Sequence, residues 1–557
     1  MVTEFNEEKQ NRRLAELRKK EEEDLAQLLS SKYAIDYLDL STVSINTDAL
    51  RLLSEKEARE ANVAPFTKVG SNIGIAFLSP GTEKAQNIKK RLEQKGLVVT
   101  PYIVSKRSLE WAWRRYKDIT ETSEVHAGVL DISSTDIVKI ATEVSTTKDV
   151  RAKIEGVLAE KKGYRISHIV EIIVAGALAL KASDIHLEPE EKEVRLRYRL
   201  DGVLTDITLL DTDTYRLLLS RIKLLSGLKL NVSAQAQDGR FSITLSDELE
   251  IEIRTSILPG AYNESVVLRI LDPRSLGVQL EDLGMRPDLL ARIEKELHRP
   301  NGMILTTGPT GSGKTTTLYS FLKKIHTPNI KIITIEDPIE YHIAGIVQTQ
   351  VDKKKYTFAN GLRSALRQDP DVIMVGEIRD NEAADIAINA SLTGHLVFST
   401  LHTNSAAGAF PRLIDIGINA KILSSAVTTV IAQRLVRKLC PDCKREVSIT
   451  PEIKEKFMEV FETSAAKDAL PQLEHMWEAA GCSTCDHSGY KGRIGIYEAI
   501  FMSPKLEELL RENPSSRDIE NLMLGENFVS MKEDGVIKIL SGITSLSELE
   551  RVVTLDA

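Results

Sequence analysis

The chain has 557 residues, of which 42% are hydrophobic and 28% are charged, and its formal net charge is −8. A single hydrophobic core stops growing beyond about 250 to 300 residues, so this length predicts several domains. The apolar content excludes a disordered chain. The acidic balance, without a long stripe of Lys and Arg, argues against nucleic acid as a partner.

Membrane and compartment signals are absent from the sequence. The longest apolar stretch, residues 172–180, is far shorter than the roughly 20 residues of a membrane-spanning helix. The first residues are charged and lack the apolar segment of a secretion signal. Four cysteines in a chain of this size fit a reducing compartment, so we expect a cytoplasmic protein with no transmembrane segment.

The N-terminal part divides into three predicted segments. Residues 1–30 are rich in Glu, Lys and Arg with leucines at helical spacing, which predicts a charged helix that is either solvated or docked on a membrane-bound partner. Residues 31–116 mix helical segments (50–61, 83–95) with strand-like runs (73–78, 97–104) and predict a small α/β domain. Residues 117–150 are polar and without a sustained period, which predicts a linker.

Residues 151–275 combine a predicted helix at 166–180 with strands of period two. Along 194–200, apolar residues alternate with Arg195, Arg197 and Arg199, and residues 249–254 alternate in the same way. One face of such a sheet packs on a core. The arginine face either meets solvent or lines an anion site, and the pattern leaves both open.

From residue 276 to 439 short apolar strands alternate with helices. The predicted strands are 302–306, 331–335, 372–375 and 396–400. This rhythm is typical of a parallel sheet covered on both faces, with ligands at the carboxyl ends of its strands. Residues 440–557 form the remaining C-terminal region.

A phosphate-binding loop follows the first of these strands. The sequence GPTGSGKT at 308–315 matches G-x-x-x-x-G-K-[ST] between a strand and a helix. Its glycines let backbone N–H groups wrap phosphates, Lys314 reaches the β and γ oxygens, and the Thr315 hydroxyl ligates Mg²⁺. We therefore predict ATP and Mg²⁺ as cofactors, bound by Gly308, Pro309, Thr310, Gly311, Ser312, Gly313, Lys314, Thr315 and Thr316.

Acidic residues and histidines end the neighbouring strands. Glu377 follows the strand 372–375, where a carboxylate can hold the magnesium ion, and Glu336 ends the strand 331–335. Either can orient the attacking water. His395 and His402 flank the strand 396–400. A lone histidine is usually structural, but two within a nucleotide-binding sheet lead us to expect that both sense the γ-phosphate.

Two C-x₂-C pairs predict a metal site. Cys440, Cys443, Cys482 and Cys485 have the spacing of a Cys₄ zinc site, in which zinc closes the long excursion 444–481. A redox disulfide is the alternative.

Together these motifs identify a family resemblance. The segments IEDP (335–338), GEIRD (376–380) and TGH to HTN (393–404), with QDGR (237–240), RTS (254–256) and GYKGRIG (489–495), resemble those of the secretion ATPases. The resemblance implies a RecA-like core preceded by a PAS-like α+β domain and an N-terminal α/β domain. It also implies a homohexamer at the inner face of the cytoplasmic membrane that acts on a membrane platform protein.

The resemblance also implies residue roles. Glu336 corresponds to the family's catalytic base and Glu377 to its metal-placing glutamate, while Arg240 and Arg254, with Arg269 as a further match, bring positive charge to the nucleotide. The tetracysteine element is also found in the family's pilus-extension and secretion branches. Asn263 departs from the family's Gly-Glu pair at 263–264. The paired Arg-Leu-Gly repeats that bind cyclic di-GMP in some relatives are not found.

Several functions compete. Type IV pilus assembly is the function we predict. The alternative is protein export by a type II secretion system, which uses the same motor. A retraction ATPase would lack the N-terminal domain and the tetracysteine. A nucleic-acid translocase is a remote alternative, and the intact Lys314, Thr315, Glu336 and Glu377 argue against a non-enzymatic regulator.

Overall fold

The computed structural model describes residues 22–40, 43, 45–50, 52–69, 72–94, 96–118, 134–159, 165–246, 249–352, 355–462, 473–526 and 528–555. The chain divides into two compact units, Met1–Asp272 and Pro273–Ala557. Most of the helix predicted over 1–30 lies outside the described residues, although residues 22–33 are helical. Among the described helices, none is both long and apolar enough to cross a membrane.

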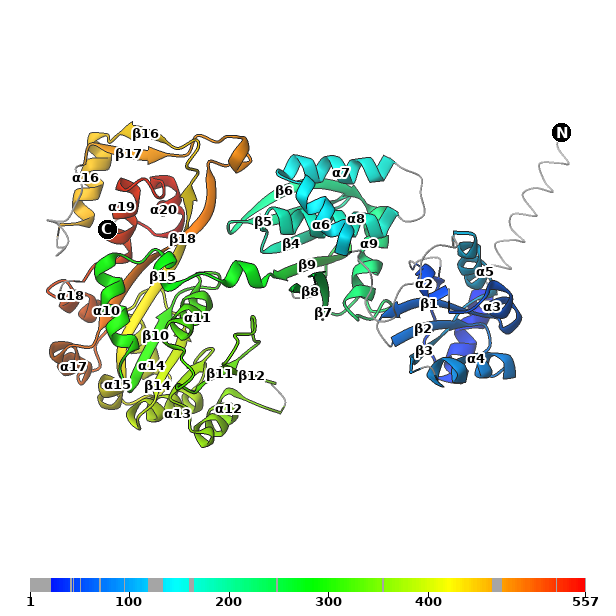
Figure 1. The fold of residues 1–557 in the computed structure, drawn as a ribbon, viewed down its shortest axis with the longest axis horizontal. Helices are drawn as coiled ribbons and strands as arrows, with labels where there is room; N and C mark the ends of the chain where they lie inside the picture. Colours follow the sequence, from blue (N-terminus) through cyan, green and yellow to red (C-terminus); the bar gives the residue numbers. More distant parts are fainter. Residues whose placement is uncertain are drawn as a thin grey trace. The chain divides into compact units, whose positions relative to one another are not determined.

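The first part of unit 1 is an α/β fold around a three-stranded sheet of order β1-β2-β3 (Figure 1). β1 and β2 are antiparallel, whereas β2 and β3 are parallel. Phe66, Ile75 and Leu109 lie in its core. The elements are α2 Thr47–Leu50, α3 Glu55–Ala61, β1 Val63–Val69, β2 Asn72–Phe77, α4 Glu83–Gln94, β3 Val98–Ile103 and α5 Lys106–Arg114.

The stretch predicted as a linker contains helices. Residues 119–133 lie outside the description, but α6 Ser134–Glu143 and α7 Thr147–Ala159 follow and pack on α8 Arg165–Ala179. Ile137 and Ile140 of α6, and Val150 and Ile154 of α7, are buried. These pairs are three or four residues apart, so each helix has a short apolar stripe that the polar composition concealed.

The second part of unit 1 is an antiparallel sheet of order β6-β5-β4-β9-β8-β7. The predicted alternation is confirmed, because Val194, Leu196 and Tyr198 are buried while the intervening arginines are partly exposed. The elements are β4 Asp184–Pro189, β5 Glu193–Leu200, β6 Val203–Asp211, α9 Thr212–Leu225, β7 Gln237–Ser246, β8 Leu249–Pro259 and β9 Glu264–Leu271.

Unit 2 is built on a seven-stranded sheet of order β12-β11-β13-β14-β10-β15-β18. The four predicted strands are confirmed. Each strand is parallel to its neighbour except β18, which runs antiparallel to β15. The strands are β10 Gly302–Thr307, β11 Ile332–Glu336, β12 Val347–Gln350, β13 Val372–Val375, β14 Leu396–Leu401, β15 Val427–Leu439 and β18 Tyr490–Phe501.

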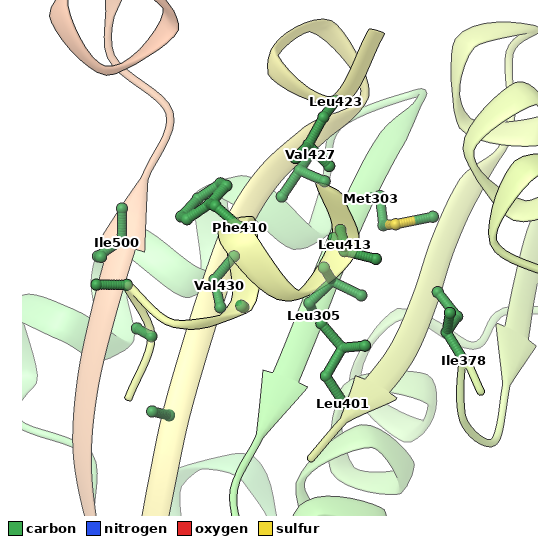
Figure 2. Close-up of a cluster of buried hydrophobic side chains, with 14 of the residues drawn as sticks. Met303, Leu305, Ile378, Leu401, Phe410, Leu413, Leu423, Val427, Val430 and Ile500 are labelled. Carbon is green, nitrogen blue, oxygen red and sulfur yellow. The ribbon is translucent and has the colours of Figure 1, made fainter. Parts of the chain in front are cut away.

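Both faces of this sheet are covered, which explains its continuous apolar strands. Met303 and Leu305 of β10 belong to one buried cluster, whereas Ile304 between them belongs to the other. Figure 2 shows Phe410 and Leu413 packed with Leu305 and Val430 on the first face. α10 Pro287–Leu297 precedes β10, and the helices between the strands are α11 Lys314–Ile325, α12 Phe358–Ala365, α13 Asn381–Leu392, α14 Ala409–Asp415 and α15 Ala420–Ala426.

The C-terminal region adds a small hairpin and a helical end to this sheet. β16 Arg445–Ser448 and β17 His475–Glu478 pair antiparallel (Figure 1). α16 Pro451–Val460 lies in the connection between these two strands. Phe457 and Phe461 bury their rings in the core of unit 2. The remaining helices are α17 Pro504–Leu510, α18 Ser516–Met523, α19 Met531–Leu540 and α20 Leu546–Val552.

Candidate functional site

The predicted phosphate loop joins β10 to α11 at the carboxyl edge of the sheet. Gly308 and Gly313 have φ angles of 149° and 91°. A Cβ atom at Gly308 would lie 2.6 Å from the carbonyl oxygen of Gln433, so only glycine fits there. The loop therefore has the strand–turn–helix setting that the motif requires, and the N-terminus of α11 favours an anion.

Lys314 lies within this loop. Its Nζ donates to the carbonyl oxygen of Gly308 at 2.7 Å and to that of Pro309 at 3.2 Å. Burial lowers the pKa of Lys314, an effect that the nearby Glu377 opposes and Arg434 reinforces. A buried ammonium with another cation near it gains stability when an anion arrives.

Glu377 joins the loop to a polar cluster. Its carboxylate pairs with Arg379, and Oε2 lies 3.4 Å from Nε2 of His402. Arg379 also contacts Asp337, with 3.4 Å between Nη1 and Oδ2. The structure thus brings Glu377 and His402 together near Lys314.

Glu336 has a different environment. It is 3% exposed, and its carboxylate accepts hydrogen bonds from the hydroxyls of Tyr319 and Thr334 and, at 3.1 Å, from Nε2 of Gln348. Burial raises the pKa of Glu336, and the three hydrogen bonds oppose that rise. β11 lies three strand positions from β10, or about 14 Å. The hydrogen bond from Tyr319 and the low exposure show that the carboxylate of Glu336 is buried and shielded from solvent.

The two predicted histidines lie at opposite edges of the sheet, so the expected position of one of them is wrong. Gly302 pairs with Leu396 and Thr307 with Leu401, so β10 and β14 run in the same direction. His402 consequently follows the strand at the edge of the phosphate loop, whereas His395 precedes it at the opposite edge, about 20 Å away along the strand. The ring Nδ1 of His395 lies 3.0 Å from the carbonyl oxygen of Ala390. The expectation that both histidines lie near the phosphates of their own chain is wrong for His395.

Sequence reasoning missed two polar residues in the middle of β15. Gln433 Nε2 donates to the carbonyl oxygen of Ser312 in the phosphate loop at 2.8 Å. Arg434 Nη2 donates to the carbonyl oxygen of Asn404 at 3.0 Å. The signal was present, because the apolar run that ends at Ala432 has the same form as the predicted strands and is followed by polar residues.

In unit 1 the predicted arginines form one row across five strands. The in-register residues are Arg199 (β5), Asp184 (β4), Arg269 (β9), Arg254 (β8) and Arg240 (β7). Asp184 lies 3.3 Å from Arg199 and 3.1 Å from Arg269. Glu252 lies 2.9 Å from Arg254 and 3.7 Å from Arg240. Cations outnumber anions in this group, and Arg240 and Arg269 are more than half exposed.

The unusual Asn263 fits its turn. Its Oδ1 accepts the backbone N–H of Glu264 at 2.8 Å, and its carbonyl oxygen accepts the N–H of Gly260 at 3.0 Å. Glu264 is buried against Lys223, with Nζ 2.7 Å from Oε2. Asparagine thus closes the hairpin between β8 and β9 and leaves the buried ion pair intact.

The four cysteines converge on one point. They are free thiols, and their Sγ atoms all lie within 4.8 Å of one another. The Sγ distances are 3.9 Å for Cys440–Cys482, 3.8 Å for Cys443–Cys485 and 3.7 Å for Cys482–Cys485. A tetrahedral zinc with Zn–S bonds of about 2.3 Å separates its sulfurs by about 3.8 Å.

Backbone groups support this cluster. The N–H groups of Cys482 and Gly489 both donate to Sγ of Cys485 at 3.2 Å. Such donors stabilise a thiolate and orient it for a metal. The four-cysteine cluster is therefore compatible with zinc.

Comparison with known proteins decides the family. The family described as "Type II/IV secretion system protein" matches residues 159–551. The chain belongs to this secretion ATPase family. A second family, described as "MshEN domain", matches residues 33–123, which contain β1 to β3.

The curated relatives include proteins named for type II secretion and a protein named for type IV pilus assembly. A "Type II secretion system protein E" of Dickeya dadantii is 44% identical over 70% of this chain and 75% of its own length. A "Type IV pilus assembly ATPase PilB" of Myxococcus xanthus is 34% identical over 95% of this chain and 91% of its own length. The solved structure of the Legionella pneumophila ATPase DotB aligns with a TM-score of 0.50 at 21% identity, covering 69% of this chain and 95% of DotB, and supports the fold. This member of the secretion ATPase family is an ATP-hydrolysing enzyme.

Proposed function

We propose that this ATPase drives the assembly of type IV pili, working as a homohexamer on a platform protein at the cytoplasmic face of the inner membrane. The observation that favours pilus assembly is coverage. The pilus assembly relative aligns with 95% of this chain, whereas the type II secretion relative from Dickeya dadantii aligns with 70%. Protein secretion remains the second candidate, because the latter relative has the higher identity, 44% against 34%.

We propose that ATP binds at residues 308–316 with Lys314 against its β and γ phosphates. The buried ammonium of Lys314 and the helix N-terminus at α11 supply the positive field that phosphates need. A magnesium ion at the Thr315 hydroxyl and Glu377 would neutralise charge on the phosphate oxygens. His402 contacts Glu377 and can sense the state of the γ-phosphate from that position.

Glu336 is proposed as the general base on the family resemblance. Its raised pKa suits a group that must accept a proton from water. Its carboxylate, however, contacts Tyr319, Thr334 and Gln348, so catalysis by Glu336 requires that it exchange one of these contacts for the attacking water.

Arg240 and Arg254 are proposed to supply transition-state charge from unit 1 of the same or a neighbouring subunit. The row of arginines provides the cations, and an arginine against the γ-phosphate raises turnover by roughly 10³ to 10⁵. Arg254→Ala should keep ATP binding and lose most turnover. Mixing Lys314→Ala subunits into wild-type rings should depress activity more steeply than dilution does, and a linear fall would contradict the coupled ring.

Four thiolates of Cys440, Cys443, Cys482 and Cys485 are proposed to hold one structural zinc. Their separations match a tetrahedral site, and the metal would fix the excursion that carries β16, α16 and β17.

The proposed function is tested in the cells that make this chain, by replacing the gene with one that encodes Lys314→Ala. We expect surface pili to disappear while exported proteins are released at the normal level. Lost export with normal pili would establish the secretion alternative instead. ATPase assays with and without DNA test the hypothesis of a nucleic-acid translocase. Strong stimulation by DNA would contradict both pilus assembly and protein secretion.

A further inference from the structure

We propose that Arg434, together with Glu498, positions the loop that carries His402, and that it does so for ATP hydrolysis rather than for nucleotide binding. The loop in question is residues 402–406, which follow β14. Neither residue belongs to the motifs discussed above, and the inference rests on the proposed role of His402.

Arg434 holds the middle of this loop. Its Nη2 donates to the backbone carbonyl oxygen of Asn404 at 3.0 Å and to the side-chain Oδ1 at 3.3 Å. Its Nη1 donates to the carbonyl oxygen of Gln433 at 3.1 Å. A guanidinium with donors on both sides can hold two backbone segments in a fixed relation, which a flexible ammonium cannot do as well.

The adjacent residue connects the same strand to the phosphate loop. Gln433 Nε2 donates to the carbonyl oxygen of Ser312, and a Cβ atom at Gly308 would lie 3.2 Å from Nη1 of Arg434. Consecutive residues in the middle of β15 therefore contact the phosphate loop and the His402 loop. A displacement of one loop relative to the other must strain this pair.

Glu498 holds the far end of the His402 loop. Its buried carboxylate accepts the backbone N–H of Ala406 at 2.7 Å and that of Met531, the first residue of α19, at 3.1 Å. Glu498 lies on β18 directly opposite Ala432 on β15, close enough to Arg434 for their charges to attract. The buried carboxylate is thus compensated by two N–H donors and one nearby cation.

The near end of the loop is tied to β10. The hydroxyls of Thr307 and Thr403 lie 2.7 Å apart, and the N–H of Thr403 donates to the Thr307 hydroxyl at 2.8 Å. Three strands, β10, β15 and β18, consequently hold a five-residue segment. Such support fits a side chain that must meet the phosphates in one geometry, since a misplacement of about 1 Å can cost about 100-fold in rate.

The experiment measures steady-state ATP hydrolysis by the full chain with Arg434→Ala. We expect kcat to fall by roughly tenfold to 100-fold while KM for ATP rises by far less, because Lys314 and the glycines of the phosphate loop remain although one nearby cation is lost. Lys438→Ala is the matched control, since it removes a cation from an exposed position of the same strand. Its kinetics should equal those of the wild type.

A double-mutant cycle separates positioning from a general structural effect. If Arg434 acts through the loop, Arg434→Ala should cost little further activity once His402→Ala is present. The inference would be overturned if the activity losses of the two single variants multiplied in the double variant. An unchanged kcat in Arg434→Ala, or a rise in KM alone, would overturn it as well. Full activity of His402→Ala would refute the proposed role of His402 and, with it, the inference that rests on that role.

Two further variants guard against misfolding. Arg434→Gln keeps most of the side-chain length without the charged fork, and Glu498→Gln keeps one acceptor but places an amide donor against the second N–H. Both should lower kcat at unchanged KM, with thermal unfolding of Arg434→Gln close to that of the control. Wild-type kcat in both variants would overturn the inference.

Discussion

The buried carboxylate of Glu336 gives the most discriminating prediction, tested by Tyr319→Phe. Tyr319 is fully buried, and its hydroxyl donates to Glu336. Its ring packs edge-on against Tyr341 with 4.5 Å between centroids. Phenylalanine keeps the ring and its packing, so the substitution removes the hydrogen bond to Glu336 and the contact of the hydroxyl with the backbone of Glu340.

The expected loss in the free energy of unfolding depends on the charge of Glu336. Three side chains donate to its two oxygens, an arrangement that suits an ionised carboxylate, which only accepts. A hydrogen bond to a charged group contributes about 1.5 to 3 kcal/mol to the free energy of unfolding, against about 0.5 to 1.5 for a neutral pair. Tyr497→Phe is the control, since the Tyr497 hydroxyl donates to the neutral carbonyl oxygen of Leu283 in the same unit.

The assay is hydrogen exchange of the buried β10 amides, which report the global opening of unit 2. At pH 8, Tyr319→Phe should speed their exchange by roughly tenfold to 150-fold, and Tyr497→Phe by about tenfold or less. An acceleration by Tyr319→Phe no larger than that of the control would refute the ionised, hydrogen-bonded carboxylate.

The pH dependence has a fixed sign. Burial raises the pKa of Glu336 in the folded chain, so as pH falls the folded state takes up the proton before the unfolded state does. The charged hydrogen bond is lost on protonation, and the effect of Tyr319→Phe should shrink as pH falls through that pKa. If Glu336 is the base, the loss of a donor that lowers its pKa should also move the acid limb of the turnover profile to higher pH.

Three further results are expected. Glu336→Gln should bind ATP but hydrolyse it poorly, whereas Glu377→Gln should also weaken the Mg²⁺ dependence of turnover, and exchanged effects would reverse the two proposed roles. His402→Ala should lower kcat by about 10² or more while His395→Ala stays near wild type, and equal losses in full-length rings would place His395 at a neighbouring subunit's site. Metal analysis should find about one zinc per chain and its loss in Cys482→Ser, and unchanged zinc content would place the metal elsewhere.

The sequence by itself determined the features that contiguous residues encode. The phosphate loop at 308–315 is a single run of residues, and each of the four predicted strands is a local apolar segment. The two cysteine pairs carry their ligand spacing in the chain. These features do not depend on which strand lies next to which, because their chemistry is set within a few residues.

The tertiary structure decided what depends on strand order and direction. All the strands around β10 run the same way, so only His402 can reach the phosphate edge, although His395 is as near to β14 in sequence. The helices α6 and α7 became visible only through their burial on α8. Arg434 and Glu498 meet residues 402–406 because β15 and β18 pair across the sheet, 30 and 92 residues away along the chain. Contacts of this kind are fixed by packing of distant segments, which no local pattern records.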